Sequence, residues 1–235
     1  MENIVIGIEG YVGAGKSSIS KELLKKLPNS ILFDGGNIYR AIVYALTQYR
    51  KDLSNIDSLS TSMENVDIKE LMDKLNVKFE IENRQSVIYV NNKKIDDAIL
   101  QSKENSIAVS VAGKAADNSH LFEFSHSLID IYKPKFNVIV TGRDLMKIYP
   151  DMNYHFFITA SLEERIKRKC IQYNKESPDV IRENIIKRDK LQEQAGFYKR
   201  YDKTIDVDVT NCKNAEEGAD MLLKYISKWG KKLEK

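Results

Sequence analysis

The glycine-rich segment at residues 10–17 constrains this chain more than any other feature of its sequence. It reads GYVGAGKS and matches the pattern G-x-x-x-x-G-K-[ST] at every fixed position. In this pattern successive backbone N–H groups turn inward around phosphate oxygens, the lysine reaches the β and γ phosphates, and the serine hydroxyl binds Mg²⁺. The segment therefore predicts a site for the phosphates of a nucleoside triphosphate and for Mg²⁺, with Ser17 as metal ligand. The expected nucleotide-binding residues are Gly10, Gly13, Ala14, Gly15, Lys16, Ser17 and Ser18.

The flanking residues supply the context that this motif requires. Residues 3–8 (NIVIGI) form a short β-branched run that is typical of a buried parallel strand. In residues 17–27 apolar side chains recur at helical spacing, and Pro28 ends the pattern. A strand, a loop and a helix in this order favour a phosphate-binding loop over a plain glycine-rich turn. The helix adds the positive end of its dipole to the site.

Further apolar runs alternate with helix-like segments along the rest of the chain. Strands are expected at residues 30–33, 136–141, 154–159 and 204–209. Helical patterns are clearest at residues 38–49 and 215–229. Strands that alternate with helices predict an α/β fold in which a parallel sheet is flanked by helices on both faces.

Residues 76–91 interrupt this alternation. Val77, Phe79 and Ile81 alternate with polar residues, residues 83–85 are turn-like, and residues 87–90 resume a strand pattern. This arrangement predicts a small antiparallel hairpin inserted into the larger fold.

Composition excludes several classes of function. The formal charge is +3, from 37 Lys and Arg against 34 Asp and Glu, which is too balanced for a nucleic-acid or membrane surface. No apolar stretch is long enough to span a membrane. Cys170 and Cys212 lack the spacing of a metal or redox pair, and the three histidines show no metal-ligand spacing. Free thiols indicate a reducing compartment, so we expect a cytoplasmic protein. A monomer is the favoured oligomeric state.

Two arginines follow expected strands. One lies in DGGNIYR, which begins at Asp34 and ends at Arg40, and the other is Arg143 in TGRD. Ligands of open α/β sheets bind at the carboxyl ends of the strands. Because the planar guanidinium pairs two oxygens at once, arginines there suit a second phosphate, carried by a small phosphorylated acceptor.

In these segments the sequence resembles the bacterial cytidylate kinases, which are nucleoside monophosphate kinases. The similarity covers nearly the whole chain, in family order: GYVGAGKSSISKELLKKL, FDGGNIYRA, the hairpin insert, TGRD, FITASLEERIKRK and IIKRD. The resemblance implies a three-layer P-loop NTPase fold with a five-stranded parallel sheet, an insert and a lid. It implies one kinase domain over residues 1–230, with the acceptor-binding insert at about 52–115, the lid at about 168–185 and a basic tail at 231–235.

The resemblance also implies roles for individual residues. Lys16 and Ser17 would hold ATP and Mg²⁺, and Arg188 would be a lid arginine that approaches the transferring phosphoryl group. Lys16, Arg143 and Arg188 would thus be the catalytic residues, with help from Arg165 and Arg168. The acceptor site would comprise Asp34, Arg40, Ser110, Arg143 and Asp144, in which the two arginines hold the phosphate, and Asp144 and Ser110 contact the base.

Three departures from the family pattern leave the acceptor open. Gly35 stands where the family has a small hydroxyl residue, and no arginine lies between Arg84 and Arg143 to contact cytosine. After Arg188, residues 190–195 (KLQEQA) lack the expected ribose aspartate and phosphate arginine. The leading hypothesis is phosphoryl transfer from ATP to CMP or dCMP. The alternatives are a non-catalytic ATP-binding regulatory protein, and a P-loop kinase for another small molecule. For an alcohol acceptor, Asp34 would be the general base.

Overall fold

The computed structural model describes residues 2–49, 70, 73–100, 102, 105, 119–172 and 177–230. The chain divides into two units: the first comprises Met1–Leu32 and Lys135–Lys235, and the second comprises Phe33–Pro134. Parts of the predicted insert (about 52–115) and of the predicted lid (about 168–185) lie outside the described residues, and both stay predictions.

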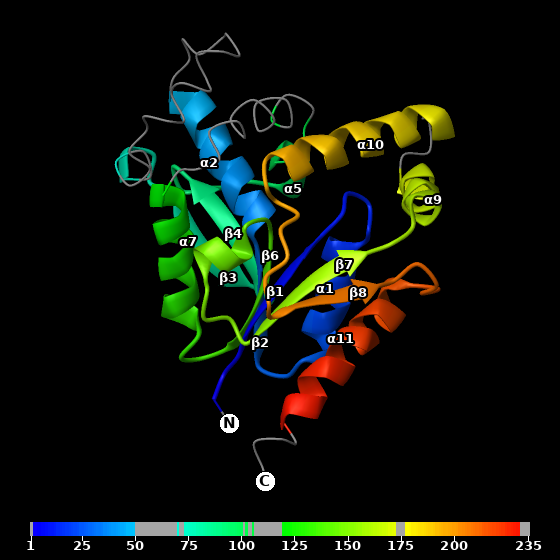
Figure 1. Cartoon of the computed structure of the whole chain (residues 1–235). Helices are drawn as coiled ribbons and strands as arrows, with labels where there is room; N and C mark the ends of the chain where they lie inside the picture. The colour runs from blue at the N-terminus through cyan, green and yellow to red at the C-terminus, as the bar shows by residue number, and fades with distance from the viewer. Residues whose placement is uncertain are drawn as a thin grey trace. The chain divides into compact units, whose positions relative to one another are not determined.

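Parallel strands form the centre of the first unit (Figure 1). Strand β1 (Val5–Gly10) pairs in parallel with β6 (Asn137–Thr141) on one side and with β7 (Tyr154–Thr159) on the other. Strand β8 (Thr204–Asp208) pairs in parallel with β7, and β2 (Ser30–Asp34) follows β6 in the strand order. All five strands lie where the apolar runs predicted them, and the predicted α/β fold is confirmed.

Helices cover both faces of β1. Ile6 and Ile8 pack in one core with residues of α1 (Lys16–Lys26) and α11 (Ala215–Gly230), two helices that lie side by side (Figure 1). Gly7 points to the opposite face, because side chains alternate along a strand. A methyl group added there would lie 2.5 Å from Met152 Sδ and 3.3 Å from Leu145, the first residue of α8 (Leu145–Ile148).

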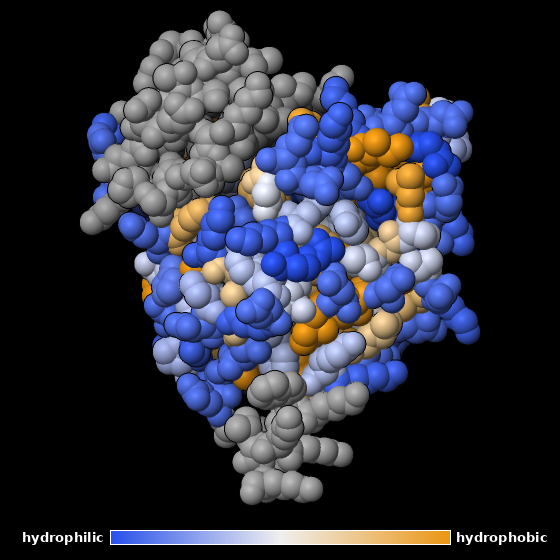
Figure 2. Space-filling model, viewed as in Figure 1, coloured by the Kyte–Doolittle hydropathy of each residue, from blue (hydrophilic) through white to orange (hydrophobic). Residues whose placement is uncertain are grey.

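Two further helices of the first unit pack against the glycine-rich loop. Helix α9 (Leu162–Gln172) and helix α10 (Pro178–Gln194) share a small core with Val12 of the loop. The Ser177 side chain caps α10 by accepting a hydrogen bond from Val180 N, and Pro178 suits the first helical turn. Figure 2 shows apolar atoms on the surface of this region, where Ile171 and Val180 are exposed.

The second unit contains the predicted hairpin. Strand β3 (Lys78–Glu82) pairs antiparallel with β4 (Gln85–Val90), and the two connecting residues, Asn83 and Arg84, have φ of 48° and 65°. Two successive left-handed residues are typical of a tight hairpin turn. The sequence did not predict β5 (Lys93–Lys94), which pairs with β4. Among its described residues, this unit includes the helices α2 (Gly35–Tyr49), α5 (Asp97–Leu100) and α7 (Ser119–Tyr132).

Candidate functional site

The glycine-rich loop connects the end of β1 to the start of α1. Gly10, Gly13 and Gly15 have φ of 149°, 78° and 101°, which side chains rarely allow. At Gly10 an added methyl group would lie 2.2 Å from Ile158 O, so the strand end also lacks space for a side chain. Gly15 is the N-cap of α1 and has no side chain that could accept the first N–H groups of the helix. A phosphate group fits these amides and the helix dipole.

Lys16 lies over the carbonyls of its own loop. Its Nζ donates hydrogen bonds to Gly10 O at 2.7 Å and to Tyr11 O at 3.0 Å. Ser17 and Ser18 are exposed in the first turn of α1. The exposed Ser17 hydroxyl fits the predicted role of a Mg²⁺ ligand beside the phosphates.

Positive side chains gather around Lys16. Burial is the main cause that lowers the pKa of Lys16, the nearby charges of Arg143 and Arg188 add to the decrease, and Glu9 and Asp189 oppose it. The resulting pKa is about 7. The first unit therefore brings together the three residues that the sequence predicted as catalytic. Such a cluster is unfavourable by itself and becomes favourable when a polyphosphate neutralises it.

We expect this lysine to make nucleotide affinity depend on pH. Because bound phosphate raises the pKa of Lys16 above its value of about 7 in the free protein, binding takes up a proton. Affinity should be greatest below pH 7, and it should fall about fivefold between pH 7 and pH 8 for a single group of this pKa. Calorimetric titration with ATP and saturating Mg²⁺ measures the effect.

The matched control for this prediction is Lys16→Arg, whose guanidinium stays protonated throughout this range. Its affinity should be lower overall and nearly constant between pH 7 and pH 8. An equal slope in both proteins would show that Lys16 does not cause the dependence.

Asp189 of α10 links three parts of the site. Its Oδ1 accepts hydrogen bonds from Val12 N at 3.2 Å and from the Tyr198 hydroxyl at 2.6 Å. Its Oδ2 accepts from Nη1 of Arg165 in α9, which also donates to Val12 O at 3.1 Å. One carboxylate thus holds the glycine-rich loop against both helices, and the neighbouring Arg188 is exposed.

Aromatic rings reinforce this attachment. Tyr11 packs edge-on against Phe157 and Tyr198, with ring centroids 5.4 Å and 4.7 Å away. The Arg165 guanidinium lies 5.1 Å from the Tyr11 ring centre, a distance suited to a cation–π contact. Burial, followed by the hydrogen bond to Asp189, raises the pKa of Tyr198, so this hydroxyl remains a donor.

Two basic residues, Lys199 and Arg200, follow α10 in the chain. The Arg200 guanidinium carbon lies 3.3 Å from the Phe157 ring centre, and its Nε donates to Asp206 Oδ1 at 3.0 Å. Lys199 Nζ lies 5.1 Å from the centre of the Tyr201 ring. These contacts give Arg200 a structural role.

Arg143 and Asp144 form the turn between β6 and α8. Arg143 is exposed and lies 5.5 Å from the Phe197 ring centre, whereas Asp144 is buried and left-handed, with φ of 53°. The next backbone amide, Leu145 N, donates to Glu9 Oε1 at 3.1 Å. Arg168, another predicted contributor, donates to Ala14 O at 2.9 Å and so supports the glycine-rich loop.

The other predicted acceptor residues belong to the second unit. Asp34 Oδ1 accepts a hydrogen bond from Asn37 N at 3.2 Å, and burial raises the pKa of this carboxyl group. Arg40 Nη1 donates to Leu100 O at 3.2 Å. Ser110 lies outside the described residues.

The sequence did not predict Asp189, Tyr198 or Glu9 as parts of the site. Asp189 carried one signal, because it follows Arg188 in the IIKRD segment. Glu9 carried another, since it is a charged residue directly after a fully apolar strand pattern.

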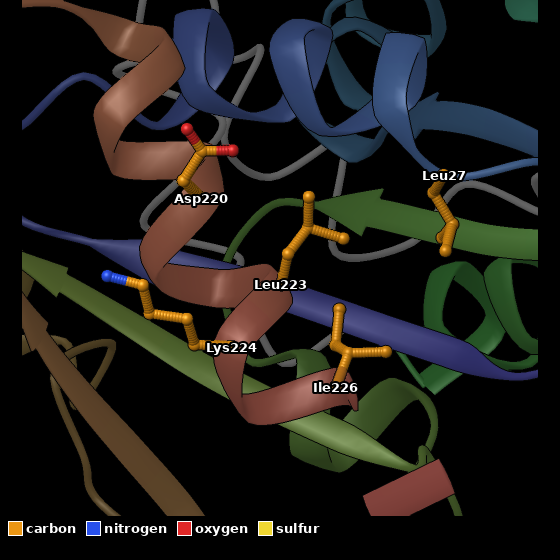
Figure 3. Close-up of a pocket in the computed structure, with 5 residues that line it drawn as sticks. All are labelled: Leu27, Asp220, Leu223, Lys224 and Ile226. Carbon is orange, nitrogen blue, oxygen red and sulfur yellow. The ribbon is translucent and has the colours of Figure 1, made fainter. Parts of the chain in front are cut away.

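A hollow elsewhere in the first unit is a poor candidate for nucleotide. Figure 3 shows its lining, which consists of Leu27 and four residues of α11: Asp220, Leu223, Lys224 and Ile226. Asp220 pairs with Lys26 at 2.5 Å, and Leu27 follows the end of α1 that is remote from Lys16.

Across the described residues, no helix is both long enough and apolar enough to span a membrane.

Comparisons with known proteins show the family of this chain. The cytidylate kinase family matches residues 6–228. A cytidylate kinase of Clostridioides difficile (strain 630) is 28% identical, over 97% of this chain and 100% of its own length. A cytidylate kinase of Bacillus cereus (strain ATCC 10987 / NRS 248) is 25% identical, over 96% of this chain and 97% of its own. A solved structure of an uncharacterized protein from Eubacterium ventriosum ATCC 27560 shares the fold, with a TM-score of 0.52 and 15% identity over 97% of this chain and 99% of that one.

Proposed function

The chain belongs to the cytidylate kinase family, and on this premise we propose that it transfers the γ phosphoryl group of ATP to CMP or dCMP. One observation carries the proposal: the first unit gathers Lys16, Arg143 and Arg188 closely enough for the two arginines to lower the pKa of the lysine. Phosphoryl transfer depends mainly on positioning and on neutralisation of phosphate charge, which such a cluster supplies.

The proposed donor site is the glycine-rich loop. Its amides and Lys16 bind the ATP phosphates, and Ser17 would hold Mg²⁺, which would supply further neutralisation of the phosphate charge. Lys16 leaves the carbonyls of Gly10 and Tyr11 when a phosphate oxygen offers a charged partner, because charge-assisted hydrogen bonds are stronger than neutral ones. Arg188 stabilises the charge on the transferring group.

The proposed acceptor site uses the turn after β6. Arg143 binds the acceptor phosphate, and Asp144 contacts the base. The acceptor phosphate is already ionised at neutral pH, so transfer needs no general base. This separates the proposal from a kinase for alcohols, in which Asp34 would have to accept a proton.

A screen for ADP release tests the proposal. Purified protein with ATP and Mg²⁺ is offered CMP, dCMP, UMP, AMP, GMP, and a panel of sugars and polyols. We expect CMP or dCMP to give the highest kcat/KM. Nucleotide binding without stimulation by any acceptor would favour a non-catalytic ATP-binding protein, and stimulation by an alcohol alone would favour a different P-loop kinase.

Arg143→Ala should raise the KM for the accepted monophosphate roughly 10- to 100-fold, since a hydrogen bond to a charged group contributes roughly 1.5–3 kcal/mol. The KM for ATP should change much less. The control is Arg182→Ala, which removes an exposed arginine that pairs with Glu163 on the surface. Equal acceptor KM values in the two variants would contradict the role of Arg143.

A further inference from the structure

Glu9 and His155 are two polar residues buried at the centre of the parallel sheet. Their exposed fractions are 2% and 0%. In the register, His155 of β7 lies opposite Gly7 of β1 and opposite Thr204 of β8. Glu9 is two residues beyond Gly7, so its side chain lies on the same face. Gly7 has no side chain there, and Met152 and Leu145 fill the space over it.

These side chains form one continuous hydrogen-bond chain. Tyr201 N donates to Thr204 Oγ1 at 2.8 Å, and Thr204 Oγ1 lies 2.9 Å from His155 Nδ1. His155 Nε2 lies 2.6 Å from Glu9 Oε2, and Glu9 Oε1 accepts from Leu145 N at 3.1 Å. Every group has a partner when the threonine hydroxyl donates to Nδ1 and the protonated Nε2 donates to the carboxylate. Both carboxylate oxygens of Glu9 thus accept a hydrogen bond.

The far end of this hydrogen-bond chain is the turn between β6 and α8, which carries Arg143 and Asp144. Leu145 N belongs to the residue that follows Asp144, whose backbone is left-handed, and it lies two residues after Arg143. A non-glycine residue in this conformation is disfavoured by itself and persists when its surroundings hold it. Glu9 also directly precedes Gly10. The same residue therefore connects the start of the glycine-rich loop to the turn that carries Arg143.

A buried carboxylate is costly unless its charge is balanced and its oxygens are hydrogen-bonded. An apolar residue on this strand would avoid the cost, as the neighbouring Ile6 and Ile8 do on the other face. We propose that Glu9 is a positioning residue that fixes the Arg143–Asp144 turn through the Leu145 amide, and so sets the affinity for the phosphorylated acceptor. This proposal rests on the proposed function, which places the acceptor at that turn.

The test compares Glu9→Gln with Glu9→Leu. Both variants lose the negative charge of Glu9, so any electrostatic effect of this loss on Lys16 is the same in both. Only glutamine retains an oxygen that can accept the Leu145 N–H hydrogen bond. We expect the acceptor KM of Glu9→Leu to exceed that of Glu9→Gln about tenfold, while the ATP KM differs less than twofold between them.

Hydrogen–deuterium exchange provides a readout that does not need turnover. The peptide that spans residues 142–149 should exchange at least tenfold faster in Glu9→Leu than in Glu9→Gln. Leu222→Val serves as the control for a general loss of stability, because Leu222 is fully buried in the core between α11 and the sheet. It should leave both the acceptor KM and the exchange of this peptide unchanged.

The outcomes separate the two proposals. Equal exchange in the two Glu9 variants would overturn the anchoring role. Faster exchange in Glu9→Leu with an unchanged acceptor KM would also overturn it, because the turn would then not govern acceptor affinity. If the parent protein releases no ADP with any monophosphate, the proposed function fails, whereas the exchange comparison still decides whether Glu9 holds the turn.

Discussion

Lys16→Met is expected to lower kcat for ADP formation about 10²- to 10³-fold at saturating ATP and acceptor, the range found when one preorganised donor to transition-state charge is removed. Methionine keeps much of the length and bulk of the lysine side chain, so the loop should remain packed. The change removes the one side chain that already reaches the loop carbonyls from the first turn of α1. Steady-state kinetics with the best acceptor of the screen gives the measurement.

The control for Lys16→Met is Lys21→Met, on the exposed surface of the same helix. It makes the same chemical change and should keep kcat within a factor of two. A kcat of Lys16→Met within fivefold of the parent would contradict a role for this lysine in the transfer step. This result would favour Arg143 and Arg188 as the cations that stabilise the transferring group.

The fold was predictable because its signals are local. Each parallel strand is a short apolar run, and the loop at residues 10–17 requires glycine wherever the backbone turns with positive φ. The hairpin was also predictable, since apolar and polar residues alternate along its strands and its turn lies at residues 83 and 84. Helix α2 was expected at residues 38–49 but begins at Gly35, where two glycines gave no helical signal.

The contacts that organise the site were not predictable in the same way. Val12 and Asp189 are 177 positions apart, and Glu9 and His155 are 146 apart, so no local pattern joins them. The histidines show no metal-ligand spacing in the sequence, but this does not reveal that Glu9 is the partner of the buried His155. The partners of Arg200 were not predictable either, because its contact with the Phe157 ring joins residues that are distant in the sequence.

Asp189→Ala is expected to lower the free energy of unfolding by about 3 kcal/mol, because breaking a buried ion pair leaves the other charge without compensation. The Arg165 side chain is only 9% exposed and that of Asp189 only 18%, so water cannot replace the lost carboxylate well. The change also removes the acceptor of Val12 N and of the Tyr198 hydroxyl. Urea denaturation followed by circular dichroism measures the loss.

A double-mutant cycle with Arg165→Met separates the ion pair from these other bonds. The double variant should be more stable than Asp189→Ala alone, because it no longer buries an unpaired guanidinium. Asp189→Asn, which keeps Oδ1 as an acceptor for Val12 N, should lie between the parent and Asp189→Ala. Glu163→Ala breaks an exposed pair with Arg182 and should change stability little. If Asp189→Ala lowered the free energy of unfolding as little as Glu163→Ala, Asp189 would not be what holds the glycine-rich loop to α9 and α10. The attachment would then depend on the core that Val12 shares with Ile166, Ile181 and Ile185.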